Sequence, residues 1–91
     1  MMKGKKGLIM GVANDRSIAW GIAKKLASEG ADIAFTYQGE ALKKRVQPLA
    51  ESIGSTILIP CDVTDSKSMV KTFKILKNEW GNIDFLVHGI G

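Results

Sequence analysis

The spacing of apolar residues changes repeatedly along the chain, from short continuous runs to a repeat of three to four residues. A nearly continuous apolar run from Gly7 to Val12 predicts a buried strand. Similar runs predict further strands at residues 33–37, 57–59 and 83–87. Four strand-like segments, separated by longer stretches of different spacing, therefore organise the sequence.

Between these strands, apolar residues recur at the spacing of an amphipathic helix. The first such segment carries Ile18, Ile22 and Leu26 on one face, with alanines beside them that allow close packing on a sheet. A second helix is predicted from Leu42 to Ile53, and a third from Met69 to Trp80. Strands and helices thus alternate throughout.

This alternation predicts an α/β protein with a parallel sheet and helices on its faces. Right-handed crossovers place strands two and three on one side of strand one and strand four on the other, which gives the order 3-2-1-4. The result is a Rossmann-type, doubly wound sheet with a ligand crevice at the carboxyl ends of its strands. Because strand four would be an unpaired edge, residues 1–91 are expected to be the N-terminal part of a single dinucleotide-binding domain. Pro48 is irregular, and we expect it to bend or break the second helix and open a new turn.

Composition limits the function classes. The chain has 91 residues, of which 45% are hydrophobic and 24% charged, as expected for one small globular domain. No segment has the length of a membrane helix or of a signal-peptide core, so we expect a cytoplasmic protein without membrane attachment. The net charge of +4 is spread over the polar sides of three helices without interleaved aromatic residues, which argues against nucleic acid. One cysteine, Cys61, and one histidine, His88, offer no metal site, and Cys61 is expected to be buried.

The junction between the first strand and the first helix has the form of a phosphate-binding turn. Gly11 lets the chain leave the strand sharply, Ser17 can cap the helix and offer a hydroxyl, and Ala19 is small enough for close backbone approach. The helix start would favour the negative charge of a pyrophosphate. However, G-x-G-x-x-G is absent, so the alternative is a plain strand–loop–helix junction with a serine cap.

Other candidate binding residues follow the later strands. Gln38 can form a hydrogen bond to a ribose hydroxyl through its amide, and Glu40, two residues later, is the alternative candidate for that bond. After strand three, Asp62 can accept a hydrogen bond from an adenine amino group while the Val63 backbone addresses the ring. The alternative for Asp62 is a role at the start of the next helix. Two glycines end strand four, where they suggest close backbone approach to a ligand.

Four blocks of sequence, in order, resemble the bacterial enoyl-acyl-carrier-protein reductases, a divergent branch of the short-chain dehydrogenases/reductases. The blocks are Gly11 with SIAWGIA from residue 17, FTYQ at 35–38, CDV at 61–63 and FLVHGIG at 85–91. The last block departs from the family in its glycines, where Ala or Ser is common nearby. The resemblance implies hydride transfer from NADH, less readily from NADPH, to the double bond of a trans-2-enoyl thioester on acyl carrier protein in fatty-acid biosynthesis. It also implies a homo-oligomer, specifically a homotetramer.

The resemblance further implies which residues meet the dinucleotide. By position these are Gly11, Ser17, Ile18, Gln38, Asp62, Val63 and Ile90, with Gly91 beside it. The family's catalytic tyrosine and lysine lie downstream, so no catalytic residue is expected in this segment and the segment alone is expected to be inactive. A non-catalytic dinucleotide-binding module and another short-chain dehydrogenase/reductase remain alternatives. A methyltransferase is disfavoured, because it would want an acid at the position of Gln38.

Overall fold

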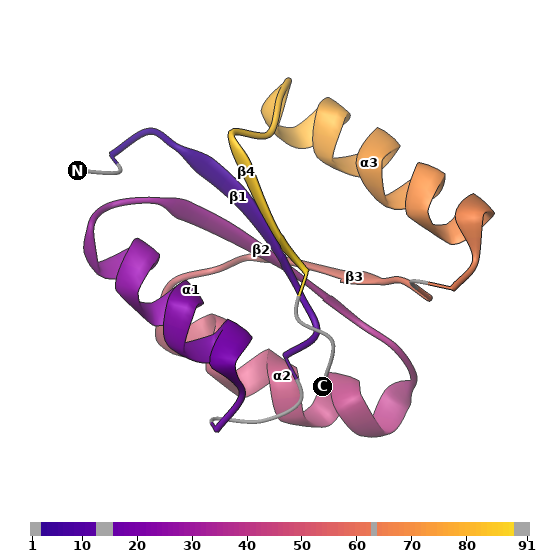
Figure 1. Ribbon diagram of the computed structural model, residues 1–91, viewed down its shortest axis with the longest axis horizontal. Helices are drawn as coiled ribbons and strands as arrows, with labels where there is room; N and C mark the ends of the chain where they lie inside the picture. Colours follow the sequence, from indigo (N-terminus) through magenta and orange to yellow (C-terminus); the bar gives the residue numbers. More distant parts are fainter. Residues whose placement is uncertain (1–2, 13–15, 63, 89–91) are drawn as a thin grey trace.

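The computed structural model describes residues 3–12, 16–62 and 64–88, in which strands and helices alternate as expected (Figure 1). The strands are β1 (Lys6–Met10), β2 (Asp32–Tyr37), β3 (Ile57–Pro60) and β4 (Phe85–His88), and the helices are α1 (Ile18–Ser28), α2 (Glu40–Ser52) and α3 (Ser66–Trp80). All neighbouring strands pair in parallel, in the order β3-β2-β1-β4. The predicted α/β class and strand order are therefore confirmed.

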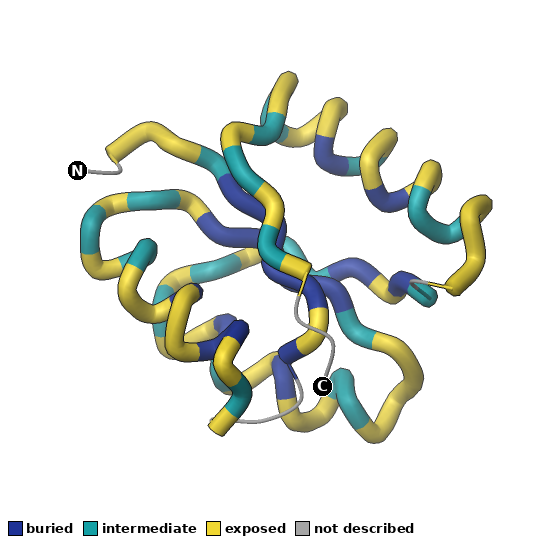
Figure 2. The backbone as a smooth tube through the Cα atoms, viewed as in Figure 1, coloured by how far each residue is buried: buried dark blue, intermediate teal, exposed yellow. Residues whose placement is uncertain are grey.

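The strand register divides the side chains into two hydrophobic cores. Ile9 of β1 is paired with Phe35 of β2 and Val87 of β4, and all three belong to the cluster beneath α1 and α2. Leu8, one residue earlier, faces the opposite side, where it packs with Leu76 of α3. Figure 1 shows the same division, with α1 and α2 on one face of the sheet and α3 on the other. Buried residues follow the central strands β1 and β2 (Figure 2).

Helix α1 packs on the sheet through its small residues and Trp20. Ala19, Trp20 and Ala23 are buried, and the Trp20 ring centroid lies 6.0 Å from that of Phe35. Ile18 is instead 84% exposed. The predicted close packing of the alanines on the sheet is confirmed for Ala19 and Ala23, whose short side chains let the helix approach the sheet closely.

Helix α2 continues through Pro48, so the expected break is wrong. Proline removes one intrahelical donor, which leaves the Lys44 carbonyl without its usual partner. Both residues are exposed, so water can satisfy that carbonyl. Val46 and Ala50 are buried on the sheet on either side of Pro48 and hold the two halves of the helix together.

Several element boundaries also differ from the sequence prediction. Strand β1 ends at Met10 rather than Val12, and α3 begins at Ser66, before Met69. Strand β4 begins at Phe85, and the Asp84 backbone N–H just before it donates to the Lys6 carbonyl of β1 at 2.7 Å. None of the helices in the described part of the chain is long and apolar enough to cross a membrane.

Candidate functional site

The carboxyl ends of the strands form one edge of the sheet, and the start of α1 lies at the same edge (Figure 1). Gly11 follows β1, Gln38 follows β2 and Asp62 follows β3. In doubly wound folds this edge, at the point where the strand order reverses, is the place for ligands. Here the reversal falls at β1, between β2 and β4, so the predicted residues share the expected edge.

The turn after β1 has the backbone that a close ligand approach requires. Gly11 has φ of +93°, a left-handed conformation that side chains rarely adopt. Ser17 occupies the N-cap position of α1, with its carbonyl accepting from the Gly21 N–H at 3.2 Å. Its side chain makes no capping hydrogen bond, so the expected capping role of its hydroxyl was wrong. The first N–H groups of α1 point to the sheet edge.

Ile18 is the first residue of α1 and stands at this edge almost fully exposed, at 84%. A large aliphatic side chain gains little in water and gains free energy when a flat apolar group covers it. Its exposure beside the turn of Gly11 fits a role in ligand contact better than a role in the core.

The end of β2 leads directly into α2 and carries two candidate polar groups. Gln38 and Glu40 are both exposed, and Gly39 between them is the N-cap of α2. Gln38 and Glu40 therefore both remain candidates for a hydrogen bond to a ribose hydroxyl. The structure adds a group that sequence reasoning had not placed: the Lys43 ammonium lies 5.9 Å from the ring centroid of Tyr37.

Asp62 is half-buried and organises the loop after β3. Its Oδ1 accepts hydrogen bonds from the Thr64 N–H at 2.9 Å and the Thr64 hydroxyl at 2.7 Å. These two bonds lower the pKa of Asp62 below its ordinary value, so the carboxylate is ionised at neutral pH. Its own N–H donates to the Ser68 hydroxyl at 2.9 Å, which ties the loop to the first turn of α3.

The alternative reading of Asp62 is therefore partly correct. Asp62 supports the start of α3, while the helix cap itself is Asp65, whose carboxylate accepts from the Lys67 N–H at 3.0 Å. Within residues 3–12, 16–62 and 64–88, however, only Oδ1 of Asp62 accepts hydrogen bonds. Among the described residues nothing donates to Oδ2, so the second oxygen remains available to a ligand.

Three predicted contacts, Val63, Ile90 and Gly91, lie outside the described residues, as does Gly89. Cys61 is buried as predicted, with its sulfur 3.6 Å from that of Met69. Within residues 3–12, 16–62 and 64–88, no three His, Cys, Asp or Glu side chains come together as a metal site would need.

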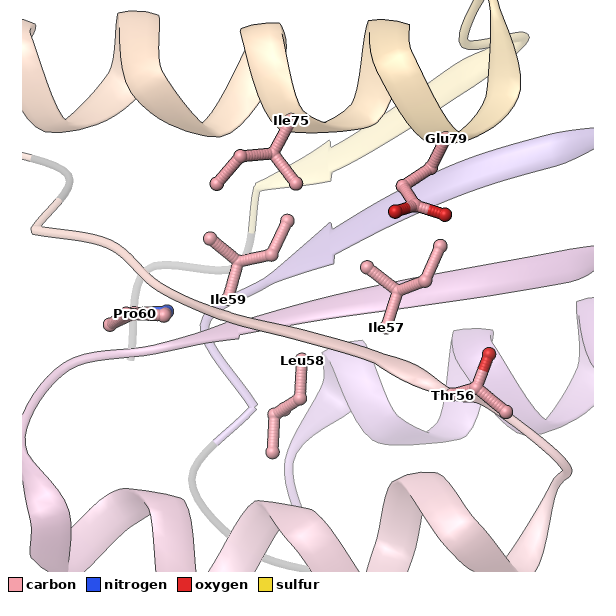
Figure 3. A pocket seen from close by; sticks show the side chains of 7 residues that line it. All are labelled: Thr56, Ile57, Leu58, Ile59, Pro60, Ile75 and Glu79. Atoms are coloured by element: carbon pink, nitrogen blue, oxygen red, sulfur yellow. The ribbon is translucent and has the colours of Figure 1, made fainter.

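A groove of about 310 Å³ runs along β3 beneath α3, away from the residues discussed above. Figure 3 shows Ile57 and Ile59 facing Ile75 across it, with Glu79 at one end, while Leu58 points to the other side of the strand. Its walls are mostly aliphatic and contain none of the candidate polar residues. The groove is therefore not the candidate site, which is the edge formed by Gly11, α1 and the ends of β2 and β3.

Comparison with known proteins identifies relatives of this chain. The family model for enoyl-(acyl carrier protein) reductase matches residues 11–91. The chain is 60% identical over 91 residues to enoyl-(acyl-carrier-protein) reductase (NADH) 2 of Rhizobium meliloti, covering 100% of this chain and 34% of that protein. It is 51% identical over 90 residues to the corresponding NADH enzyme of Rickettsia typhi, covering 99% of this chain and 34% of that one. The chain thus spans about a third of the length of the curated relatives it matches.

Solved structures of enoyl-(acyl-carrier-protein) reductases share the fold of this chain. An enoyl-(acyl-carrier-protein) reductase of Anaplasma phagocytophilum in complex with NAD superposes with a TM-score of 0.91 at 57% identity, over 96% of this chain and 33% of that one. The Bacillus cereus reductase with NADP+ and an indole naphthyridinone gives 0.88 at 42% identity, over 94% of this chain and 35% of that one.

Proposed function

Because this chain belongs to the enoyl-(acyl carrier protein) reductase family, we propose that it supplies the dinucleotide-binding part of a cytoplasmic reductase. The reaction would be hydride transfer from NADH to the double bond of a trans-2-enoyl thioester carried by acyl carrier protein. Residues 1–91 would be the N-terminal part of a single domain, in an enzyme that assembles as a homotetramer. The observation that carries the proposal is the sheet edge where Gly11 and the start of α1 meet the ends of β2 and β3.

We assign each part of the dinucleotide, the pyrophosphate, the ribose and the adenine, to different residues at this edge. The first N–H groups of α1, at Ser17 and Ile18, suit the pyrophosphate, since helix N-termini favour negative charge. Gln38 suits a ribose hydroxyl, and Oδ2 of Asp62 suits the adenine amino group. Val63, Ile90 and Gly91 are included by their position in the family pattern, and Gly11 gives the backbone room to approach.

NADH is the proposed cofactor, for two reasons. The Rhizobium meliloti and Rickettsia typhi relatives are named as NADH enzymes, and the Anaplasma phagocytophilum structure contains NAD. Gln38 at the end of β2 is a neutral amide that can bond a ribose hydroxyl but brings no charge for a 2′-phosphate.

Catalysis is assigned to groups outside this segment. When bound, NADH supplies the hydride, and reduction of an enoyl thioester then needs stabilisation of negative charge on the thioester oxygen and a proton donor. His88 is the one imidazole of the chain, and it lies on β4 opposite Met10, which faces α3 rather than the α1 side of the sheet. The described residues therefore bind and orient the cofactor, and no proton transfer is assigned to them.

The proposal is tested in two steps. First, fluorescence titration of the 91-residue chain with NADH should show saturable binding that is weakened by Gly11→Val, which cannot adopt the positive φ, and not by Gly21→Ala. Second, a chimera with residues 1–91 joined to the remaining two-thirds of a matched relative should oxidise NADH with a crotonyl thioester on acyl carrier protein. Absence of NADH binding in the folded chain would refute the proposal. A folded chimera that binds NADH without turnover would favour the non-catalytic module instead.

A further inference from the structure

The outer side of α3 carries a row of lysines, which we call the lysine stripe. Helix α3 contains a single acidic residue, Glu79, and four exposed lysines: Lys67, Lys71, Lys74 and Lys77. The intervals of four, three and three residues place these lysines along one side of the helix, opposite the buried Thr72 and Leu76. At a rise of about 1.5 Å per residue, the stripe is roughly 15 Å long.

The lysine stripe opposes the stability of its own helix. Lys67 is the second residue of α3, where the helix dipole disfavours a positive charge, and the first turn has no acidic residue. Lysines three or four residues apart on a helix also repel one another. Among the residues that the structure describes, the one salt bridge joins Lys6 to Asp32, so no ion pair offsets this repulsion. A local pattern that works against the fold is typical of a surface that serves binding.

An exposed aliphatic side chain lies within the stripe. Val70 is 54% exposed, and it stands three residues after Lys67 and four before Lys74, so both lysines are its neighbours on the helix surface. Glu79 lies away from it, at the groove beside β3 (Figure 3). The surface therefore has an apolar centre and a basic rim, which is the usual arrangement of a protein–protein interface.

We propose that the lysine stripe, with Val70 at its centre, is a docking surface for an acidic amphipathic helix of a partner protein. Carboxylates at intervals of three and four residues on that helix would meet the lysines, and an aliphatic side chain between them would cover Val70. The bound carboxylates would also remove the mutual repulsion of the lysines. A nucleic-acid backbone offers no apolar group for Val70. A membrane surface requires a broad apolar helix face, and that of α3 is packed on the sheet through Leu76 and Met69.

The test titrates the full 91-residue chain with a helical peptide that carries glutamates at intervals of three and four residues around a central leucine. A peptide of the same composition, with its glutamates spread around the helix, is the control and should bind at least about fivefold more weakly. The double variant Lys71→Gln/Lys74→Gln should weaken binding of the first peptide about fivefold, through the loss of two exposed ion pairs. Lys24→Gln/Lys25→Gln removes two exposed charges from α1 and should change this binding by less than about twofold.

Equal affinity for the two peptides, or equal losses in the two double variants, would overturn the proposal. Binding of a DNA duplex or of phosphatidylserine vesicles as tightly as the first peptide would also overturn it, because positive charge alone would then explain the stripe. Circular dichroism of each variant checks that the chain remains folded.

Stability and cofactor binding provide independent readouts. Lys71→Glu replaces repulsion with Lys67 and Lys74 by attraction, so it should raise the urea-unfolding midpoint while it abolishes binding of the first peptide. Because α3 and α1 lie on opposite faces of the sheet (Figure 1), the same variant should leave the NADH dissociation constant within about twofold of the wild type. A Lys71→Glu chain that still binds the peptide, or that is less stable than the wild type, would contradict the proposal. A wild-type chain that binds the peptide but no NADH would refute the proposed function and leave the docking surface standing.

Discussion

Asp62 offers a decisive test of the proposed site because the hydrogen bonds that it accepts from Thr64 use only one of its two carboxylate oxygens. Oδ1 accepts two hydrogen bonds from Thr64, and Oδ2 accepts none from the described residues. Asp62→Asn keeps an oxygen that can accept both Thr64 bonds but replaces the other oxygen with an NH₂ group. Asp62→Ala removes both carboxylate oxygens and with them both Thr64 bonds. The first variant therefore changes the oxygen proposed to face the ligand and removes the negative charge, while it keeps the Thr64 bonds in weaker form, and the second also loosens the loop that leads into α3.

The size of the effect follows from one hydrogen bond. Loss of a bond to a charged acceptor from a bound adenine amino group corresponds to about a tenfold rise in the dissociation constant of NADH. In Asp62→Asn the new NH₂ group also meets the donor of the adenine, so the loss is not smaller than this. Asp62→Ala should weaken binding at least as much and should also lower the unfolding midpoint, because two local bonds of the loop are gone.

The assay is a fluorescence titration with NADH, paired with urea unfolding of the same samples. Thr64→Val is the control for the loop, since it removes the 2.7 Å hydroxyl bond and leaves Oδ2 unchanged. It should lower stability slightly and leave NADH binding within about twofold of the wild type. If Asp62→Asn binds NADH as tightly as the wild type, the adenine contact is refuted and Asp62 serves the loop alone.

Three further changes test the packing of the sheet, the titration of Asp62 and the location of catalysis. Gly7→Ala places a Cβ against the Phe85 ring and should cost about 1–3 kcal/mol in urea unfolding, whereas Gly21→Ala, in open space on α1, should gain about 0.5–1 kcal/mol; equal stability of the two variants would contradict the packing. Because the pKa of Asp62 is lowered in the folded protein, the contribution of its carboxylate to stability is complete above its ordinary pKa near 3.8. That contribution is lost as the pH falls through the lower folded value. The urea-unfolding midpoints of wild type and Asp62→Asn should therefore differ by a constant amount between about pH 5 and pH 8 and converge only in stronger acid. A difference that changes near neutral pH would assign the effect to another group. The 91-residue chain alone should show no NADH oxidation with a crotonyl thioester; turnover lost in His88→Ala would place catalysis inside this segment.

The sequence by itself determined the class, the order of elements and the strand order. Short continuous apolar runs and a repeat of three to four residues distinguish strands from helices, and the handedness of parallel crossovers then leaves few topologies. It also located the edge where Gly11, Gln38 and Asp62 meet, because the ends of parallel strands share one side of a sheet.

Only the tertiary structure determined how individual side chains are placed within this fold. The exposure of Ile18 at the start of α1, beside the buried Ala19 and Trp20, depends on how the helix is seated on the sheet, which spacing alone does not fix. The continuity of α2 through Pro48 depends on packing on both sides of it, which outweighs one lost hydrogen bond. The pairing of Lys43 with Tyr37 joins a helix to the strand before it across a turn. Each of these three features depends on which side chains come into contact after folding, and the order of residues along the chain does not specify those contacts directly.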